Sequence, residues 1–287
     1  MFHGLRWLAS RLASGGMESL RRRGEALGRW HYRLAWRQRR QLNPQIQRAL
    51  GLSSGEQAAE LLGEAFAVND RAVLEILAMY SGAVTADEVS RVCEVAGLDT
   101  LDLALERGRG VVLLGLHMGN GVAMATALAR RGYPVHVVFR ESGKISPGFF
   151  EHGLGSLGIT AVNAKPPGAG LRRMLTVLKR NGVLFILMDQ GMKSGGVEAT
   201  LMGKRLNMPP GPAELARRSG SAVIPALMQG ASPRWRFKLD EAHYFDRAMP
   251  LETAVANLTQ IMQKQIEKQP QWWTWHQRRW ARHPFID

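Results

Sequence analysis

From residue 111 onward the sequence alternates between short apolar runs and amphipathic segments of about 10–15 residues. The runs have the length of buried strands, and they are VVLLGL (111–116), YPVHVVFR (133–140), ITAVNA (159–164), VLFILMD (183–189) and AVIPALMQ (222–229). The segments between them carry apolar residues at helical spacing. Strands that alternate with helices in this way favour a mostly parallel sheet with helices on both faces. We therefore expect an α/β fold.

The flanking regions predict further helices and one strand pair. Residues 56–80 have apolar positions three and four apart, which is typical of a helix. Residues 85–97 start with a Thr85-x-x-Glu capping box and end in glycine, so we expect a single helix there. Residues 234–245 alternate like an antiparallel edge pair, and residues 252–270 predict a long amphipathic helix.

Composition limits the classes of protein that this chain can belong to. The 287 residues are 45% hydrophobic, which allows one large domain with a sizeable core. Cys93 is the only cysteine, so a disulfide within the chain and a zinc site of several thiolates are excluded. No metal-ligand spacing and no cofactor motif is present, and we expect neither a metal nor a cofactor. The formal net charge of +14 favours a polyanionic partner.

The positive charge is concentrated near the N-terminus. Residues 1–48 hold eleven arginines and two glutamates, interspersed with leucine and tryptophan at amphipathic spacing. Such helices suit a membrane surface, although two ordinary helices packed on the main domain would show a similar pattern. No run of about 18 apolar residues is present, so no transmembrane helix is expected. We predict membrane-associating basic helices over 1–38 and the α/β domain over 39–287.

His117 follows the first predicted strand and precedes Gly-Asn-Gly, which opens a helix. The carboxyl ends of strands host the chemistry of doubly wound sheets. A histidine at this place is a candidate base, and helix N–H groups beside it suit an anionic substrate. A polar residue that merely ends a strand is the alternative. The pattern GLGSLG (153–158) matches a dinucleotide motif, but it follows a helix and runs into a strand, so we do not expect a dinucleotide there.

Several ordered segments together resemble a known family. They are RRQLNPQIQRAL (39–50), HMGN (117–120), VVFR (137–140), MDQG (188–191), residues 201–225 and residues 266–280 with WWTWHQRRW. From about residue 39 to 282, this order resembles the bacterial lipid A secondary acyltransferases, the lauroyl and myristoyl transferases of the lysophospholipid acyltransferase superfamily. The resemblance implies a glycerolipid acyltransferase-like fold.

The resemblance also implies roles for individual residues. His117 would be the base that takes a proton from an acceptor hydroxyl, and Arg140 would bind an anionic headgroup. Asp189 and Gln190 would line the site, and the tail aromatics with Arg278 would pack near it or touch lipid. The residues assigned to substrate binding are therefore Asn120, Arg140, Gln190 and Arg278. Arg140 as a mere strand-end charge, and the tail tryptophans as mere core, are the alternatives.

One position departs from the family pattern. The family carries an acid five residues after the histidine, and this chain has Val122 there, preceded by Gly121 in place of tryptophan. Either another acid orients the imidazole, or the reaction differs, or the site is inactive. Asp189 ends a strand at the same sheet edge and is our candidate for that acid, with Glu141 second.

We therefore expect an acyltransferase that moves a fatty acyl chain from acyl carrier protein or CoA to a hydroxyl of a lipid A-type or other glycolipid. Its partners would be that donor, an anionic lipid or glycolipid acceptor, and the cytoplasmic surface of the cell inner membrane, where it would be peripheral. The alternative is a catalytically impaired protein of the same fold that binds lipid or acyl carrier protein. Nucleic acid is not an expected partner, because no stacking platform or helix-turn-helix accompanies the charge.

Overall fold

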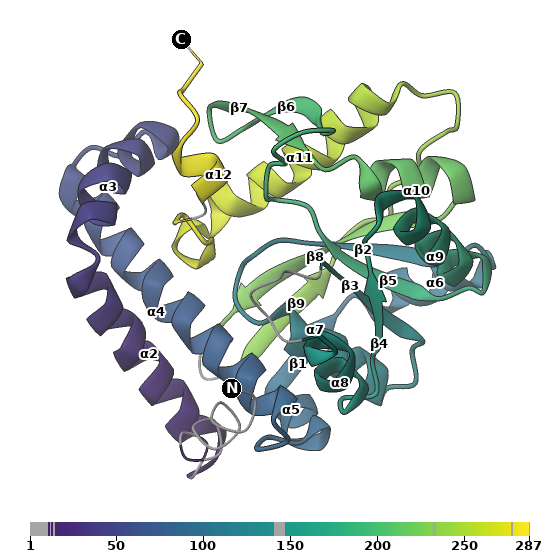
Figure 1. Cartoon of the computed structure of the whole chain (residues 1–287), viewed down its shortest axis with the longest axis horizontal. Coiled ribbons are helices and arrows are strands. Elements are labelled where there is room, and N and C mark those ends of the chain that lie inside the picture. Colours follow the sequence, from purple (N-terminus) through teal and green to yellow (C-terminus); the bar gives the residue numbers. More distant parts are fainter. Residues whose placement is uncertain are drawn as a thin grey trace.

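The computed structural model describes residues 11, 13, 15–140, 147–231, 234–276 and 278–286. Its centre is a seven-stranded sheet in the order β1-β9-β8-β2-β5-β3-β4 (Figure 1). The strands are β1 Cys93–Ala96, β2 Val111–Gly115, β3 Val135–Phe139, β4 Thr160–Asn163, β5 Val183–Leu187, β8 Ala222–Gly230 and β9 Trp235–Leu239. Neighbouring strands are parallel, except for the antiparallel pair β8 and β9. The expected α/β fold with a mostly parallel sheet is confirmed.

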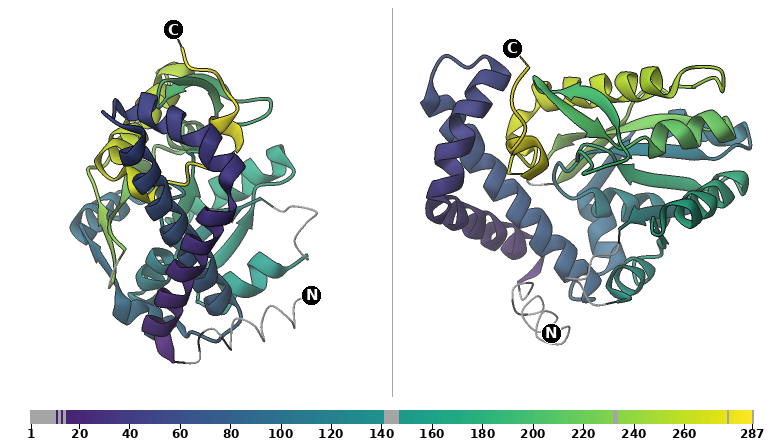
Figure 2. Two further views of the ribbon diagram at one scale, coloured as in Figure 1. Left: turned by 90° about the vertical axis from the view of Figure 1, so that its left-hand side faces the viewer. Right: turned by 45° about the horizontal axis from the view of Figure 1, so that its top comes forward.

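Helices cover both faces of the sheet (Figures 1 and 2). Helix α9 packs against α10, β4 and β5, and α7 packs against α5, β1 and β3. The helices of the α/β body are α5 Ala86–Val92, α6 Leu98–Glu106, α7 Gly121–Arg130, α8 Phe149–Gly155, α9 Pro167–Lys179, α10 Gly211–Ser219 and α11 Leu251–Lys268. A short 3-10 helix, η1 Pro270–Trp272, and α12 Arg278–Ala281 complete the C-terminal segment.

Three N-terminal helices lie together at one side of the body (Figure 1), and they are α2 Gly16–Leu34, α3 Trp36–Leu50 and α4 Gly55–Tyr80. Helix α2 packs against α4 at very short range, because Gly24 and Gly28 face it. A Cβ atom at Gly28 would lie 2.4 Å from the carbonyl oxygen of Phe66. The sequence-based division at 38/39 falls within α3. Among the described residues, no helix is long and apolar enough to span a bilayer.

Two local expectations are wrong, and both for tertiary reasons. The capping box of Thr85 and Glu88 is present, but its helix ends at Val92, and Cys93–Ala96 forms β1. Parallel pairing with β9 draws these residues into the sheet. Strand β9 lies inside the sheet, between β8 and β1. It therefore does not form an antiparallel edge pair with the residues that follow it. The hairpin of β6 Val197–Leu201 and β7 Lys204–Met208 was not anticipated.

Candidate active site at the carboxyl edge of the sheet

His117 leaves the sheet beyond a strand that is buried along its whole length. Strand β2 lies in the middle of the sheet, between β8 and β5, and all five of its residues are buried. In the parallel register of β2 and β5, Gly115 is paired with Leu187. His117 and Asp189 each lie two residues beyond that pair. The register therefore brings both side chains to the same edge of the sheet, as the strand pattern predicts for parallel neighbours.

The carboxylate of Asp189 is fully buried and accepts hydrogen bonds from several donors. Its Oδ1 lies 2.7 Å from Nδ1 of His117. Its Oδ2 accepts from the backbone N–H of His117 at 3.0 Å and from the indole N–H of Trp273 at 2.8 Å. Donors on both oxygens favour the ionised carboxylate. Nδ1 of His117 then carries its proton toward Asp189, and Nε2 keeps the lone pair that a base needs.

The environment of His117 tunes its basicity. Burial lowers the pKa of the imidazole, whereas the charge of Asp189 and the hydrogen bond to it raise that pKa. The two contributions of Asp189 together outweigh burial, so the pKa of His117 lies above its ordinary value. The side chain remains 35% exposed. A bound molecule can therefore reach the part of the ring that does not face Asp189.

The C-terminal segment bonds to the loop that carries His117, which connects β2 with α7. The carbonyl oxygen of His117 accepts hydrogen bonds from the backbone N–H of Thr274 at 3.1 Å and from its hydroxyl at 2.8 Å. Met118 and Trp273 form an antiparallel bridge. Three tail tryptophans are buried and meet edge to face, and they are Trp273, Trp275 and Trp280. These aromatic side chains are core, and one of them also bonds to the carboxylate of the site.

Asn120 lies close to His117 in the chain but its side chain points into the interior. The residue is fully buried and caps α7, since its Oδ1 accepts from the backbone N–H of Ala123 at 3.0 Å. Its Nδ2 donates to Glu75 at 3.1 Å. Val122 lies one position into α7 and is partly buried. The structure thus places Asn120 as a cap behind the loop, and Asp189 at the imidazole that the family acid would have held.

The remaining sequence-predicted residues lie at different distances from this pair. Arg140 follows β3, next to β5 at the same sheet edge, and its side chain is exposed. Gln190 follows Asp189 and is partly buried. Arg278 begins α12, and its side chain lies outside the described part of the chain. Glu141, the second candidate acid, also lies outside the described residues.

Sequence reasoning placed the tail aromatics near the site, but it missed Glu75 and the contacts of Trp273 and Thr274. Trp273 and Thr274 lie in the tail motif WWTWHQRRW, whose importance was visible but whose contacts were not. Glu75 lies in the predicted helix 56–80, and the sequence alone gives no reason to expect this charged residue anywhere but on the helix surface. Its burial follows from packing between α4, α7 and β9, and no local signal marks it.

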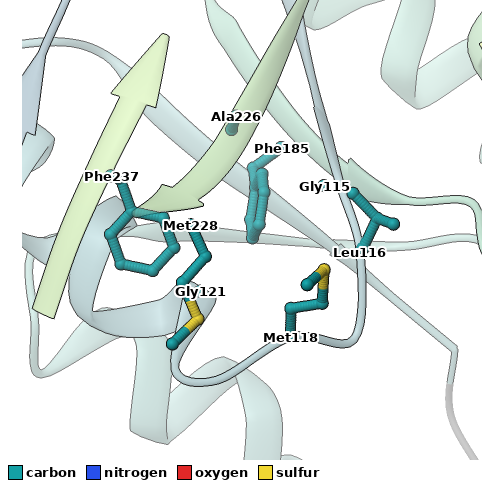
Figure 3. Close-up of a pocket in the computed structure, with 8 residues that line it drawn as sticks. All are labelled: Gly115, Leu116, Met118, Gly121, Phe185, Ala226, Met228 and Phe237. Carbon is teal, nitrogen blue, oxygen red and sulfur yellow. The ribbon is translucent and has the colours of Figure 1, made fainter. Parts of the chain in front are cut away.

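An apolar pocket adjoins the loop of His117 (Figure 3). The cavity is small, about 10 Å³, which is room for about one water molecule. The lining residues are Gly115, Leu116, Met118, Gly121, Phe185, Ala226, Met228 and Phe237. Leu116 and Met118 flank His117 in the chain, so the pocket lies directly beside the imidazole-bearing loop. Its lining suits a hydrocarbon group and offers no charged side chain.

Helix α2 carries an apolar stripe that no other described part of the chain covers. Leu27, Trp30 and Leu34 lie three and four residues apart and are exposed, with Trp30 57% exposed. Leu20 at the start of the helix is buried instead. Exposed arginines lie on the same helix and in the first turns of α3, and they are Arg22, Arg23, Arg29, Arg33, Arg37 and Arg40. Arginine with tryptophan around an apolar stripe is typical of helices that lie on a membrane surface.

Comparison with known proteins gives the family of this chain. Phosphatidylinositol mannoside acyltransferases of two Mycobacterium tuberculosis strains (CDC 1551 / Oshkosh and ATCC 25618 / H37Rv) are each 31% identical to the chain over 150 residues. That match covers 50% of this chain and 46% of each relative, so the chain spans about half the length of these curated relatives. The family model described as bacterial lipid A biosynthesis acyltransferase matches residues 7–282. That match runs through the loop of His117, the strand end at Asp189 and the tail that holds both, so this chain belongs to the bacterial lipid A biosynthesis acyltransferase family.

Proposed function

We propose that the protein transfers a fatty acyl chain from a thioester to a hydroxyl group of a glycolipid. The thioester would be carried by acyl carrier protein or by CoA. The observation that carries this proposal is the pair of His117 and Asp189, with Nδ1 bound to a buried carboxylate and Nε2 left without a hydrogen-bond partner among the described residues. This is the arrangement that turns an imidazole into a general base for a hydroxyl nucleophile.

In the proposed reaction, Nε2 of His117 removes the proton of the acceptor hydroxyl as its oxygen attacks the thioester carbonyl. Asp189 stabilises the imidazolium that forms and keeps the ring in one tautomer. The tetrahedral intermediate then expels the thiolate of the donor. The imidazolium returns its proton to that sulfur, so that the products are an ester and a free thiol.

The surroundings of His117 supply binding groups for both substrates. The apolar pocket beside Met118 would take part of the acyl chain of the donor. Arg140, exposed at the end of β3, would pair with an anionic headgroup, because a guanidinium matches phosphate oxygens well. Gln190 follows Asp189 at the same edge and would contact the acceptor. The acceptor is a lipid A-type glycolipid or another glycolipid, such as the mannosylated phosphatidylinositol in the name of the two relatives.

We also propose a peripheral position on the cytoplasmic face of the inner membrane, and the stripe of Leu27, Trp30 and Leu34 supports attachment to a membrane surface. The arginines around it would meet anionic headgroups while the apolar side chains enter the interface. A glycolipid acceptor would then be presented in the same plane in which the enzyme is held.

Transfer by the purified protein tests this function. Acyl-CoA and acyl carrier protein thioesters are incubated with bacterial glycolipid extract, and intact-lipid mass spectrometry records the acylated product. We expect wild-type protein to give product and His117→Ala to give none above background. His136→Ala is the matched control, because this histidine lies on β3 and bonds to the carbonyl of Pro134 rather than to Asp189. Product from His117→Ala at the wild-type rate would refute the proposed mechanism. Binding of either substrate without transfer by wild type would favour the impaired alternative.

A further inference from the structure

Glu75 of α4 is an acidic residue in the middle of the protein core. Its side chain has no exposed surface. Its Oε1 accepts from Nε of Arg71 at 2.7 Å, and its Oε2 accepts from Nδ2 of Asn120 at 3.1 Å. The indole N–H of Trp235 on β9 also donates to Oε2. A buried carboxylate needs this degree of pairing, since an unpaired charge in the core is strongly destabilising.

Two of these partners reach the loop that carries His117. The first is Asn120, which ends the loop and caps α7 through its other amide atom. Because Glu75 accepts from Nδ2, the Oδ1 atom of Asn120 is left facing the backbone N–H of Ala123. Glu75 therefore fixes the orientation of the cap and, with it, the point where the loop enters the helix.

The second partner is Trp235, whose ring supports Gly119. Gly119 has a φ of 61°, and a Cβ atom there would lie 2.5 Å from the Trp235 ring. The chain thus passes directly over the indole at a backbone conformation that glycine adopts easily. The hydrogen bond to Glu75 holds this indole in place, so a single carboxylate supports the loop at two consecutive residues.

The cation that pairs with Glu75 is Arg71. Arg71 on the preceding turn of α4 pairs with it and also stacks over Trp235, with the guanidinium carbon 4.3 Å from the ring centroid. Nη1 of Arg71 lies 3.4 Å from Oε1 of Glu25 on α2. The carboxylate that supports the loop is therefore itself held by a cation that cannot move away without losing two other contacts.

We propose that Glu75 is a positioning residue for the reaction, which holds the loop of residues 117–120 so that the imidazole of His117 meets Asp189. The inference rests on the proposed role of His117 as the base. Glu75 touches neither the imidazole nor Asp189, and it acts through Asn120 and Trp235. A base displaced by even 1 Å can lose about a hundredfold in rate, so a support behind the loop has a kinetic effect.

Three variants separate positioning from general stability. Glu75→Gln places an amide donor against donors and disturbs both supports. Asn120→Ser keeps an oxygen that can cap α7 but removes the donor to Glu75. Trp235→Phe keeps most of the ring beneath Gly119 but removes its N–H. Glu214→Gln is the matched control, because Glu214 pairs with Arg217 and Arg218 on α10 and has no contact with the loop.

The test combines steady-state kinetics with the pKa of His117, measured by NMR of histidine-labelled protein and assigned with His117→Ala. We expect Glu75→Gln to lower kcat about 10- to 100-fold with little change in KM. We also expect the pKa of His117 to fall toward its ordinary value as contact with Asp189 loosens. Asn120→Ser and Trp235→Phe should each show a smaller effect of the same kind. Trp235→Phe should lower kcat by a smaller factor in the Glu75→Gln background than in the wild-type background, because both changes affect the same hydrogen bond.

The proposal is overturned if folded Glu75→Gln keeps the wild-type kcat and the wild-type pKa of His117. If Glu75→Gln does not fold, Asn120→Ser and Trp235→Phe test the proposal instead. A wild-type kcat and a wild-type pKa of His117 in both of these variants would also overturn the proposal. The NMR measurement needs no turnover. An inactive wild-type protein whose His117 still loses its raised pKa in the variants would therefore refute the proposed reaction and support the positioning role.

Discussion

Asp189 bonds to His117 twice, once through Nδ1 of the ring and once through the backbone N–H. The same carboxylate thus fixes the side chain of the base and the chain segment that presents it. A third donor, the indole of Trp273, fixes the carboxylate in turn. Asp189 makes these contacts although it lies 72 residues after His117 in the chain.

Asp189→Asn should lower the rate of acyl transfer by about 10⁴-fold, as loss of the orienting carboxylate does in serine proteases. An amide can still accept one hydrogen bond, but it does not stabilise the imidazolium by charge. Single-turnover measurement with saturating donor checks this. Asp240→Asn is the control, because Asp240 follows β9, which runs opposite to β2, and pairs with exposed Lys238. Full activity of Asp189→Asn, or a gain of activity in Val122→Glu, would mean that Asp189 does not serve the base.

Acyl transfer should rise with pH, because only neutral His117 accepts a proton. Asp189 raises the pKa of His117, so the midpoint of kcat/KM should lie above the ordinary value of 6.5. In Asp189→Asn the midpoint should move down. A wild-type midpoint at or below that of the variant contradicts the pairing.

The same raised pKa predicts a pH dependence of stability. The folded protein binds the proton of His117 more tightly than the unfolded chain does. The stabilisation is therefore complete below pH 6.5 and is lost as the pH rises through the folded-state pKa. The free energy of unfolding of wild type minus that of His117→Ala, from urea titrations at a series of pH values, should decrease over that window. A free-energy difference that increases with pH would contradict the raised pKa of His117.

The double variant Trp30→Ala/Leu34→Ala should weaken binding to anionic vesicles at least about tenfold, since each side chain would bury apolar surface in the interface. Point variants are preferable to deletion of α2, because Gly24 and Gly28 pack this helix closely on α4. Co-sedimentation with phosphatidylglycerol vesicles measures the binding. Leu103→Ala removes an equally exposed leucine from α6 and should have no effect. Equal losses in the two proteins would assign attachment to another surface.

Gly121→Val should shift the preference of the enzyme toward shorter acyl donors. Even a Cβ atom at Gly121 would lie 2.9 Å from the ring of Phe185, so a larger side chain narrows the apolar pocket. Competition between donors of different chain length, read by mass spectrometry of the product, measures the shift. Gly155→Ala is the control, because a Cβ atom there meets no neighbour within 4 Å. An unchanged product distribution would place the acyl chain elsewhere.

The sequence by itself determined the parts of this protein that depend on local periodicity. Apolar runs separated by amphipathic segments predicted the parallel sheet, and the position of His117 just after such a run predicted its place at the carboxyl edge. Thr85 and Glu88 predicted a helix start correctly, because a capping box is formed within four residues. Strand length, helical spacing and caps are properties of neighbouring residues, so they can be read from the order of amino acids.

Tertiary structure decided which distant groups meet. The pairing of Cys93–Ala96 with β9 turned the end of a predicted helix into a strand. The register of β2 with β5 placed Asp189 opposite His117, whereas the sequence left Asp189 and Glu141 as two candidates. No local pattern predicts the hydrogen bonds of Glu75 and Trp273, because these bonds join residues 45 and 84 positions apart. A buried carboxylate persists only where several distant donors converge on it, and convergence of that kind is a property of the packed fold.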